Sequence, residues 1–99
     1  MSADDARALA LALPGAVEQD HHGRPSFRAG GLILATLWTE RQMNVMAGEE
    51  LIRAAANTHP GSCKEVFWGK RLSAVGVDLD QVDAEVLEDL LDAAWQRVR

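Results

Sequence analysis

The sequence predicts a single α+β domain, in which one antiparallel β-sheet packs against helices at the N and C termini. Amphipathic helical patterns stand at both ends of the chain, near residues 2–13 and 83–98. Between them, a double glycine joins two β-like runs, as a tight hairpin requires. With 99 residues, of which 47% are hydrophobic, the chain has the length and composition of one folded domain over residues 1–99.

The first helix begins at a capping signal. Ser2 followed by Asp5 resembles a capping box with aspartate in place of glutamate. Apolar residues then recur at helical spacing as far as Leu13, and Pro14-Gly15 ends the run. We therefore expect a helix of about three turns, followed by a short extended piece over residues 17–20.

The clearest β signal is Gly30-Gly31, which supplies the two positive-φ residues of a type I′ turn between strands at 26–29 and 32–38. Such a turn fixes the register and places Trp38 on the face of Phe27. A further turn at 39–41 leads to a third strand at 42–47, which completes a meander. The expected facing pairs are Ala29 with Leu32, Arg28 with Ile33, and Phe27 with Leu34.

The second half of the chain repeats this alternation of helix and strand. Residues 49–56 read as a short helix closed by Asn57, and residues 66–79 read as one or two strands with a turn at 69–71. Asp83 can cap the last helix, whose apolar stripe includes Trp95. We expect this helix to lie across the sheet and seal the core.

The charge of the chain is unevenly distributed along the sequence. The net charge of −5 argues against a general nucleic-acid binder, which draws its affinity from neutralised phosphates. Residues 21–75, however, hold seven basic groups against four acidic ones. Any anion site is therefore expected in the middle of the chain.

The composition also bears on the compartment. The single cysteine, Cys63, cannot form an internal disulfide, and the sequence has no apolar leader and no apolar run of membrane length. These features predict a cytoplasmic setting with no membrane association.

Two groups of residues are candidate reaction or metal centres. His21 and His22 adjoin acidic residues, but neighbouring strand residues face opposite ways, so surface histidines beside a turn are expected rather than a metal site. His59 and Cys63 fall short of the four ligands of structural zinc, and no nucleophile signature surrounds Cys63. Phosphate-binding glycine motifs are absent. The sequence predicts no catalytic residue, metal or cofactor.

Basic residues near predicted turns form the remaining candidate site. Trp38 and Trp68 lie close to them in sequence and offer surfaces for stacking, although either tryptophan could also belong to the core. The alternative interpretation is surface charge dispersed over the protein. The basic residues in question are Arg24, Arg28, Arg41, Lys64, Lys70 and Arg71.

The order of these features resembles the MmcQ/YjbR family. The likeness is carried by the segments LALPGAVEQ (11–19), PSFRAGGLILATL (25–37), LSAVGVDL (72–79) and LEDLLDAAWQRV (87–98), which together span most of the chain. The resemblance implies a curved antiparallel sheet covered by helices, similar to the frataxin-like arrangement and described as a double wing. It also implies DNA binding, and it brings no catalytic residues.

The sequence and the resemblance together predict a small non-enzymatic binding domain. The expected contacts to DNA phosphates are Arg24, Arg28, Lys70 and Arg71. Glu18, His21 and His22 are a further candidate, as a polar rim beside the hairpin. The alternative function is a protein-interaction module or homodimer that uses a sheet edge or the Trp68 region and binds no nucleic acid.

Overall fold

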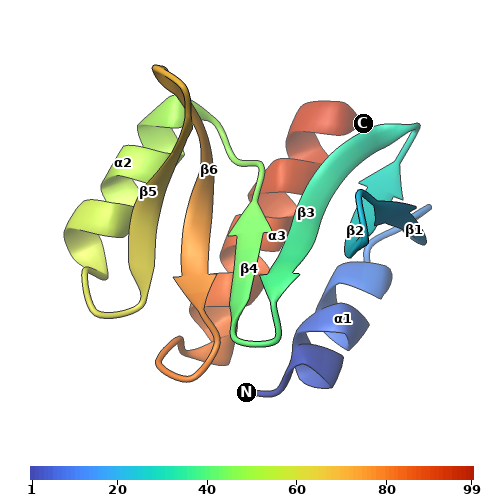
Figure 1. The fold of residues 1–99 in the computed structure, drawn as a ribbon, viewed down its shortest axis with the longest axis horizontal. Coiled ribbons are helices and arrows are strands. Elements are labelled where there is room, and N and C mark those ends of the chain that lie inside the picture. Colours follow the sequence, from blue (N-terminus) through green and yellow to red (C-terminus); the bar gives the residue numbers. More distant parts are fainter.

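A computed structural model describes residues 1–99, which form three helices and six strands (Figure 1). None of the helices has the length and apolar character needed to cross a membrane. In chain order the elements are α1 (Ala3–Leu11), β1 (Val17–His21), β2 (Arg24–Ala29), β3 (Leu32–Thr39), β4 (Gln42–Val45), α2 (Glu49–Thr58), β5 (Cys63–Trp68), β6 (Arg71–Asp78) and α3 (Ala84–Val98).

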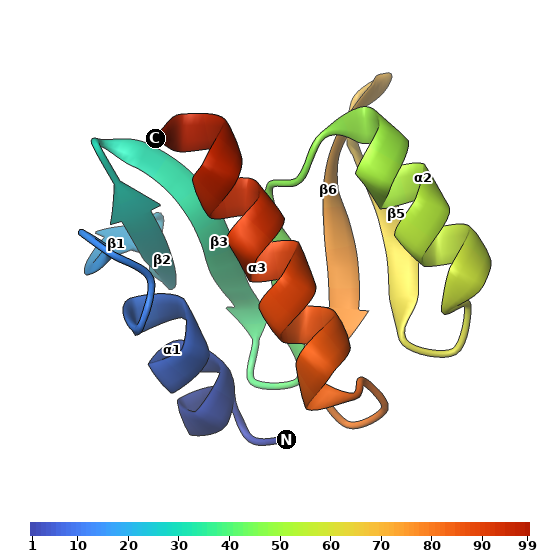
Figure 2. The same cartoon turned by 180° about the vertical axis from the view of Figure 1, so that it is seen from behind.

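The strands form one six-stranded sheet in the order β1-β2-β3-β4-β6-β5, and every ladder is antiparallel. Neighbouring strands follow one another in the chain except at β4 and β6, between which α2 and β5 intervene. All three helices cover the same face of the sheet, with α3 across its middle, α2 along β5 and β6, and α1 beside α3 (Figure 2). The opposite face carries no helix, and we call it the open face. The α+β fold predicted from the sequence is confirmed.

The core lies between the sheet and the helices. It consists of 22 buried apolar residues in one continuous cluster. Trp95 lies at its margin, where its indole Nε1 donates a hydrogen bond of 2.8 Å to the carbonyl oxygen of Pro14 and so ties α3 to the turn that follows α1. The largest fully buried side chains are Phe27, Leu34, Met43, Ile52, Leu79, Leu87 and Leu91.

The helix ends follow the predicted signals in part. The Ser2–Asp5 capping box is present, since Ser2 Oγ accepts the Asp5 N–H and Asp5 Oδ2 accepts the Ser2 N–H, both at 3.0 Å. The hydrogen bond from the Ser2 N–H, with a smaller effect of the Ser2 hydroxyl, lowers the pKa of the Asp5 carboxyl. The stabilisation is therefore present above the usual pKa range of an aspartate and is lost on acidification. Asp83 does occupy the N-cap of α3, but its side chain makes no capping hydrogen bond.

The Gly30-Gly31 hairpin forms as predicted, with φ of 60° and 80°. Two of the three expected pairs are correct, but Phe27 faces Ala35 instead of Leu34, because β3 contains a bulge at this point. The extra residue shifts the alternation of β3, which turns Ala35 and Leu37 toward the core. Trp38 therefore lies on the open face, and its expected position on the face of Phe27 was wrong.

A second tight turn joins β1 to β2, at the histidines that were expected to lie beside a turn, although its type was not predicted. His22 and Gly23 both have positive φ, 54° and 84°, as the central residues of a type I′ turn require. The Gly23 N–H donates to Asp20 Oδ2 at 3.2 Å and closes the turn. Histidine at the first central position conceals the turn, because the usual signal there is Asn, Asp or Gly.

We predict that His22→Gly stabilises the fold by about 1 kcal/mol, because a side chain in the left-handed region is strained and glycine is not. Chemical denaturation with matched m-values measures the change. The control is His59→Gly, at a φ of −125°, which should lose stability through the added freedom of the unfolded chain. A loss of stability in both variants would contradict the argument from φ.

Candidate functional site

A row of small or polar residues crosses the open face at right angles to the strands. Ser26, Thr36, Asn44 and Gly76 face one another in register on β2, β3, β4 and β6. Thr36 is only 4% exposed and Asn44 only 2%, although no helix covers them. Larger side chains around them must therefore exclude water, so the row is the floor of a hollow. We call these four residues the polar floor.

The hollow contains a cavity of about 300 Å³, which we call the aromatic pocket. Its lining comes from both edges of the sheet, since His21 belongs to β1 and Trp68 to β5. In a flat sheet, five interstrand spacings of about 4.8 Å would separate these strands by about 24 Å. The sheet must therefore curve and twist strongly toward its open face, so that its two edge strands approach each other. The lining residues are His21, His22, Arg24, Thr36, Trp38, Asn44 and Trp68.

One wall of the aromatic pocket is a stacked pair on β2 and β3. The Arg24 guanidinium lies 3.8 Å from the centre of the Trp38 ring, within the range of a cation–π interaction. Arg24 Nε also donates to the Trp38 carbonyl oxygen at 2.9 Å. Because Nε is the atom used, the two terminal nitrogens of Arg24 remain available to a ligand.

A second arginine is held beside the same wall. Arg28 donates from Nε to Ser26 Oγ and from a terminal nitrogen to His21 Nδ1, both at 3.2 Å. Since a guanidinium has no acceptor, His21 Nδ1 must be the acceptor, and the ring proton of His21 resides on Nε2. The Ser26 hydroxyl in turn donates to the Gln19 carbonyl oxygen at 2.9 Å. This chain of hydrogen bonds fixes Arg28 in place on the open face.

The base of the pocket offers hydrogen-bonding groups. Gln42 donates to Asn44 Oδ1 at 2.8 Å, whereas Asn44 Nδ2 and Thr36 Oγ1 have no protein partner. No fully buried side-chain polar atom in the protein lacks a hydrogen bond, so these two atoms must reach solvent, and both residues line the pocket. The pocket therefore presents an amide donor and a hydroxyl at its base.

The opposite side of the pocket comes from the hairpin of β5 and β6. Trp68 is 50% exposed and pairs with Arg71 across this hairpin, next to the turn that carries Lys70. Of the four expected phosphate contacts, Arg24 lines the aromatic pocket and Arg28 is bonded to His21 in its lining. Arg71 lines a neighbouring pocket together with Trp68, Glu49 and Arg97, and Lys70 lies in the turn between Trp68 and Arg71. Thr36 and Asn44 were not predicted as site residues, although polar residues inside two apolar strands were an available signal.

Glu18 does not share the site with the two histidines. On β1 it faces the helices, where it accepts a hydrogen bond of 2.9 Å from Arg7 Nε of α1. Alternation along β1 sends His21 to the open face, so the expected rim of Glu18, His21 and His22 is split between two faces. No three His, Cys, Asp or Glu side chains gather as a metal site would require.

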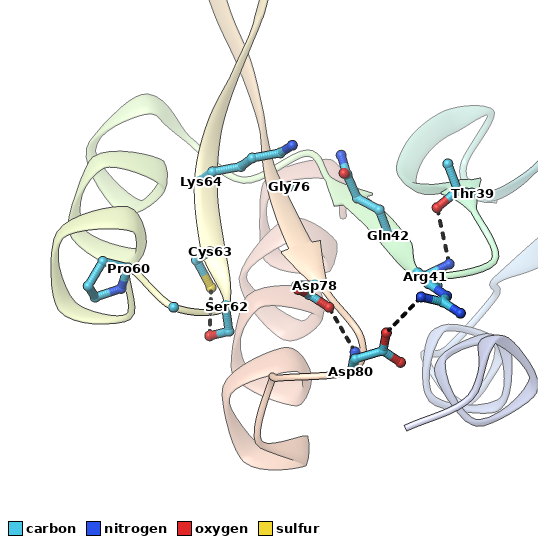
Figure 3. A pocket seen from close by; sticks show the side chains of 11 residues that line it. Thr39, Arg41, Gln42, Pro60, Ser62, Cys63, Lys64, Gly76, Asp78 and Asp80 are labelled. Atoms are coloured by element: carbon cyan, nitrogen blue, oxygen red, sulfur yellow. Dashed lines mark hydrogen bonds and ion pairs between the residues drawn. The ribbon is translucent and has the colours of Figure 1, made fainter.

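A second pocket, of about 350 Å³, lies at the other end of the open face (Figure 3). Arg41 and Lys64 line it, but so do Asp78 and Asp80, and Arg41 lies 3.9 Å from the carboxylate of Asp80. Figure 3 shows no aromatic side chain among its labelled residues. Mixed charges and the absence of a stacking surface make this pocket a weaker anion site than the aromatic pocket.

The fold and the order of the motifs agree with one known family, whose model, YjbR, matches residues 11–97. The chain belongs to the YjbR family. The crystal structure of Deinococcus radiodurans protein DR2400, with family domain DUF419, is similar at a TM-score of 0.78 and 24% identity, over 96% of this chain and 76% of that one. This likeness extends to the fold alone. No curated protein matches the chain.

Gly76 controls the packing of the open face of this YjbR domain. A Cβ atom there would lie 2.9 Å from Val66 Cγ2, 3.0 Å from Gln42 Nε2 and 3.2 Å from Lys64 Cε. Glycine at this position therefore lets neighbouring side chains lie across β6. One of them, Gln42, is the hydrogen-bond donor to Asn44 in the polar floor.

We predict that Gly76→Ala destabilises the YjbR domain by about 1–3 kcal/mol, because the added methyl group overpacks this contact. Denaturant titration measures the loss. Gly61→Ala is the control, since a Cβ atom at Gly61 meets nothing within 4 Å and its stability should be unchanged or slightly raised. Equal effects at the two glycines would show that crowding is not the cause.

Cys63, the only thiol of the YjbR domain, is a poor nucleophile. It is 3% exposed and belongs to the core cluster. Burial raises the pKa of the Cys63 thiol, and the smaller opposing effect of the Ser62 hydroxyl, 3.8 Å away, does not reverse this. Since the thiolate is the reactive form, the folded protein holds Cys63 in its unreactive state near neutral pH.

We predict that Cys63 of the folded protein reacts with a disulfide reagent at least about tenfold more slowly than the unfolded chain at about pH 8. Because the raised pKa belongs to the folded state, stability is fully present below the unfolded pKa and declines as the pH rises above it. Absorbance of the released thiolate follows the reaction with and without denaturant. Equal rates in the two states would contradict the prediction.

Proposed function

We propose that this YjbR-family protein is a non-enzymatic binding protein that binds DNA on its open face. Arg24, Arg28, Lys70 and Arg71 contact the phosphates, and the aromatic pocket is lined by Arg24 and by Trp68, which pairs with Arg71. The protonated Cys63 thiol and the lack of any carboxylate among the residues that line the pocket support binding rather than catalysis.

The separation of charge between the two faces carries this proposal. On the strands, the charged residues that alternate onto the open face are Arg24, Arg28, Lys64 and Arg71, with Asp78 as the only acid. A chain with a net charge of −5 therefore presents a basic sheet face. The helices carry more than half of the 15 acidic residues: Asp4, Asp5, Glu49, Glu50, Glu85, Glu88, Asp89 and Asp92.

This arrangement favours oriented binding of a polyanion. A phosphate backbone is attracted to the open face and repelled by the acidic helix layer, so only one face of the protein is suited to it. Arg24 is held through Nε, which leaves both of its terminal nitrogens for phosphate oxygens, whereas Arg28 uses Nε and one terminal nitrogen and keeps the other available. Such contacts position a nucleic acid without reading its sequence.

We predict salt-sensitive binding of DNA, which fluorescence anisotropy of a labelled duplex of about 20 base pairs measures. With about four phosphate contacts, raising the salt from about 50 to about 200 mM should weaken binding by about 100-fold. The double variant Arg28→Ala/Lys70→Ala should reduce the slope of log K against log salt by about 2, since two contacts are lost.

The control is Arg53→Ala/Arg99→Ala, which removes the same charge from α2 and the C-terminus and should leave the slope unchanged. Absence of binding at low salt, or equal behaviour of the two double variants, would refute the proposal. In that event, exposed Phe67 and Trp68 on the edge strand β5 would favour self-association, the second candidate function. Light scattering over a concentration series measures it.

A further inference from the structure

The aromatic pocket differs from a simple phosphate-binding surface in its depth and its lining. We infer that it accepts one unstacked base of a single-stranded segment, which lies against Trp68 while the flanking phosphates rest on Arg24 and Arg28. This inference rests on the proposed function and adds to it the kind of nucleic acid that the open face prefers.

The size of the pocket limits its occupant. At about 300 Å³, the cavity stands at the lower end of the range for small-molecule sites, which suits one planar ring system. Trp68 is 50% exposed and carries no cation on its ring, whereas Arg24 already covers a face of Trp38. Trp68 is therefore the surface on which an incoming base can stack.

The polar groups at the bottom of the pocket explain why a nucleobase, rather than an apolar ring, is the expected occupant. Asn44 Nδ2 and Thr36 Oγ1 open onto the pocket without protein partners. His21 adds a donor, because its Nδ1 is engaged by Arg28 and its proton is on Nε2. An apolar occupant would cover these groups without satisfying them, and that loss is costly. The edge of a nucleobase provides matching acceptors and donors.

Duplex DNA cannot satisfy the same groups. In a duplex the faces of the bases are stacked on one another, and only their edges are accessible from the grooves. A base can then cover the ring of Trp68, or the floor at Thr36 and Asn44, only if it is first extruded from the duplex. That extrusion costs a few kcal/mol. Single strands offer bases that are already free to leave the stack.

The test separates the base from the phosphates. Two labelled strands of about ten nucleotides are compared by anisotropy at low salt, one made entirely of abasic residues and one with a single central thymine. Their charges are equal. We expect the single thymine to tighten binding by about 10-fold to 100-fold in the unaltered protein, and the duplex of equal length to bind less tightly than the thymine strand.

Variants of the hairpin residues assign the gain to the pocket. Trp68→Ala should abolish the advantage of the thymine strand, and Trp68→Phe should restore part of it, because phenylalanine keeps a smaller stacking face. Phe67→Ala is the matched control, since Phe67 is 52% exposed on the same strand but alternates to the other face of the sheet. It should keep the full advantage.

The outcomes distinguish this inference from the proposed function. Equal binding of the two strands, with the salt dependence intact, would overturn the single-base inference and leave DNA binding through phosphates in place. Absence of binding for duplex and strands alike would refute both. If thymidine monophosphate quenches tryptophan fluorescence and binds as tightly as the thymine strand, the occupant is a free nucleotide, and the inference about strands is overturned.

Discussion

One-sided burial of the sheet is the constraint on which the rest of the structure depends. All three helices pack on one face, so every large apolar side chain that the sheet needs for stability must alternate onto that face. On the open face, small and polar residues, among them Ser26, Thr36 and Asn44, form a floor that is buried because the sheet curves and larger side chains such as Trp38 and Trp68 surround it. The hollow on this face thus follows from the same constraint that builds the core.

The same division organises the charges. Helices that cover a sheet expose their outer faces to water, and here those faces are mostly acidic. No helix covers the open face of the sheet, so the few charged residues on the strands determine the electrostatic potential of that face. Arg24 and Arg28 meet no carboxylate there, whereas Arg7 of helix α1 pairs with Asp4 and Glu18. Net charge alone therefore gives a misleading description of this protein.

Local signals in the sequence were sufficient for most of the elements, because caps and turns are local interactions. Ser2 with Asp5 and Gly30 with Gly31 each formed as their chemistry predicts. The bulge opposite Phe27 was not predictable, since the extra residue lies inside β3, away from the turn whose residues fix the register. This one residue decided the face on which Trp38 lies.

The candidate site was predictable only in outline. The excess of basic residues between positions 21 and 75 indicated the part of the chain to consider, and Arg24 and Arg28 lie on the open face within it. Their closeness to Trp68 depends on the twist and curvature of the whole sheet, which no local pattern encodes. For the same reason, the separation of Glu18 from His21 required the strand register.

The sheet order has a consequence for how the pocket is maintained. Strands β1 to β4 and the hairpin of β5 and β6 are each built from neighbours in sequence, and within the sheet the two parts meet only at the β4–β6 ladder. Arg24 and Trp68 stand on opposite sides of that joint. Opening of this ladder would divide the pocket while leaving each hairpin whole, so any ligand that bridges it also holds the joint closed. Occupancy of the pocket would then be detectable as slower hydrogen exchange of the backbone amides in the β4–β6 ladder.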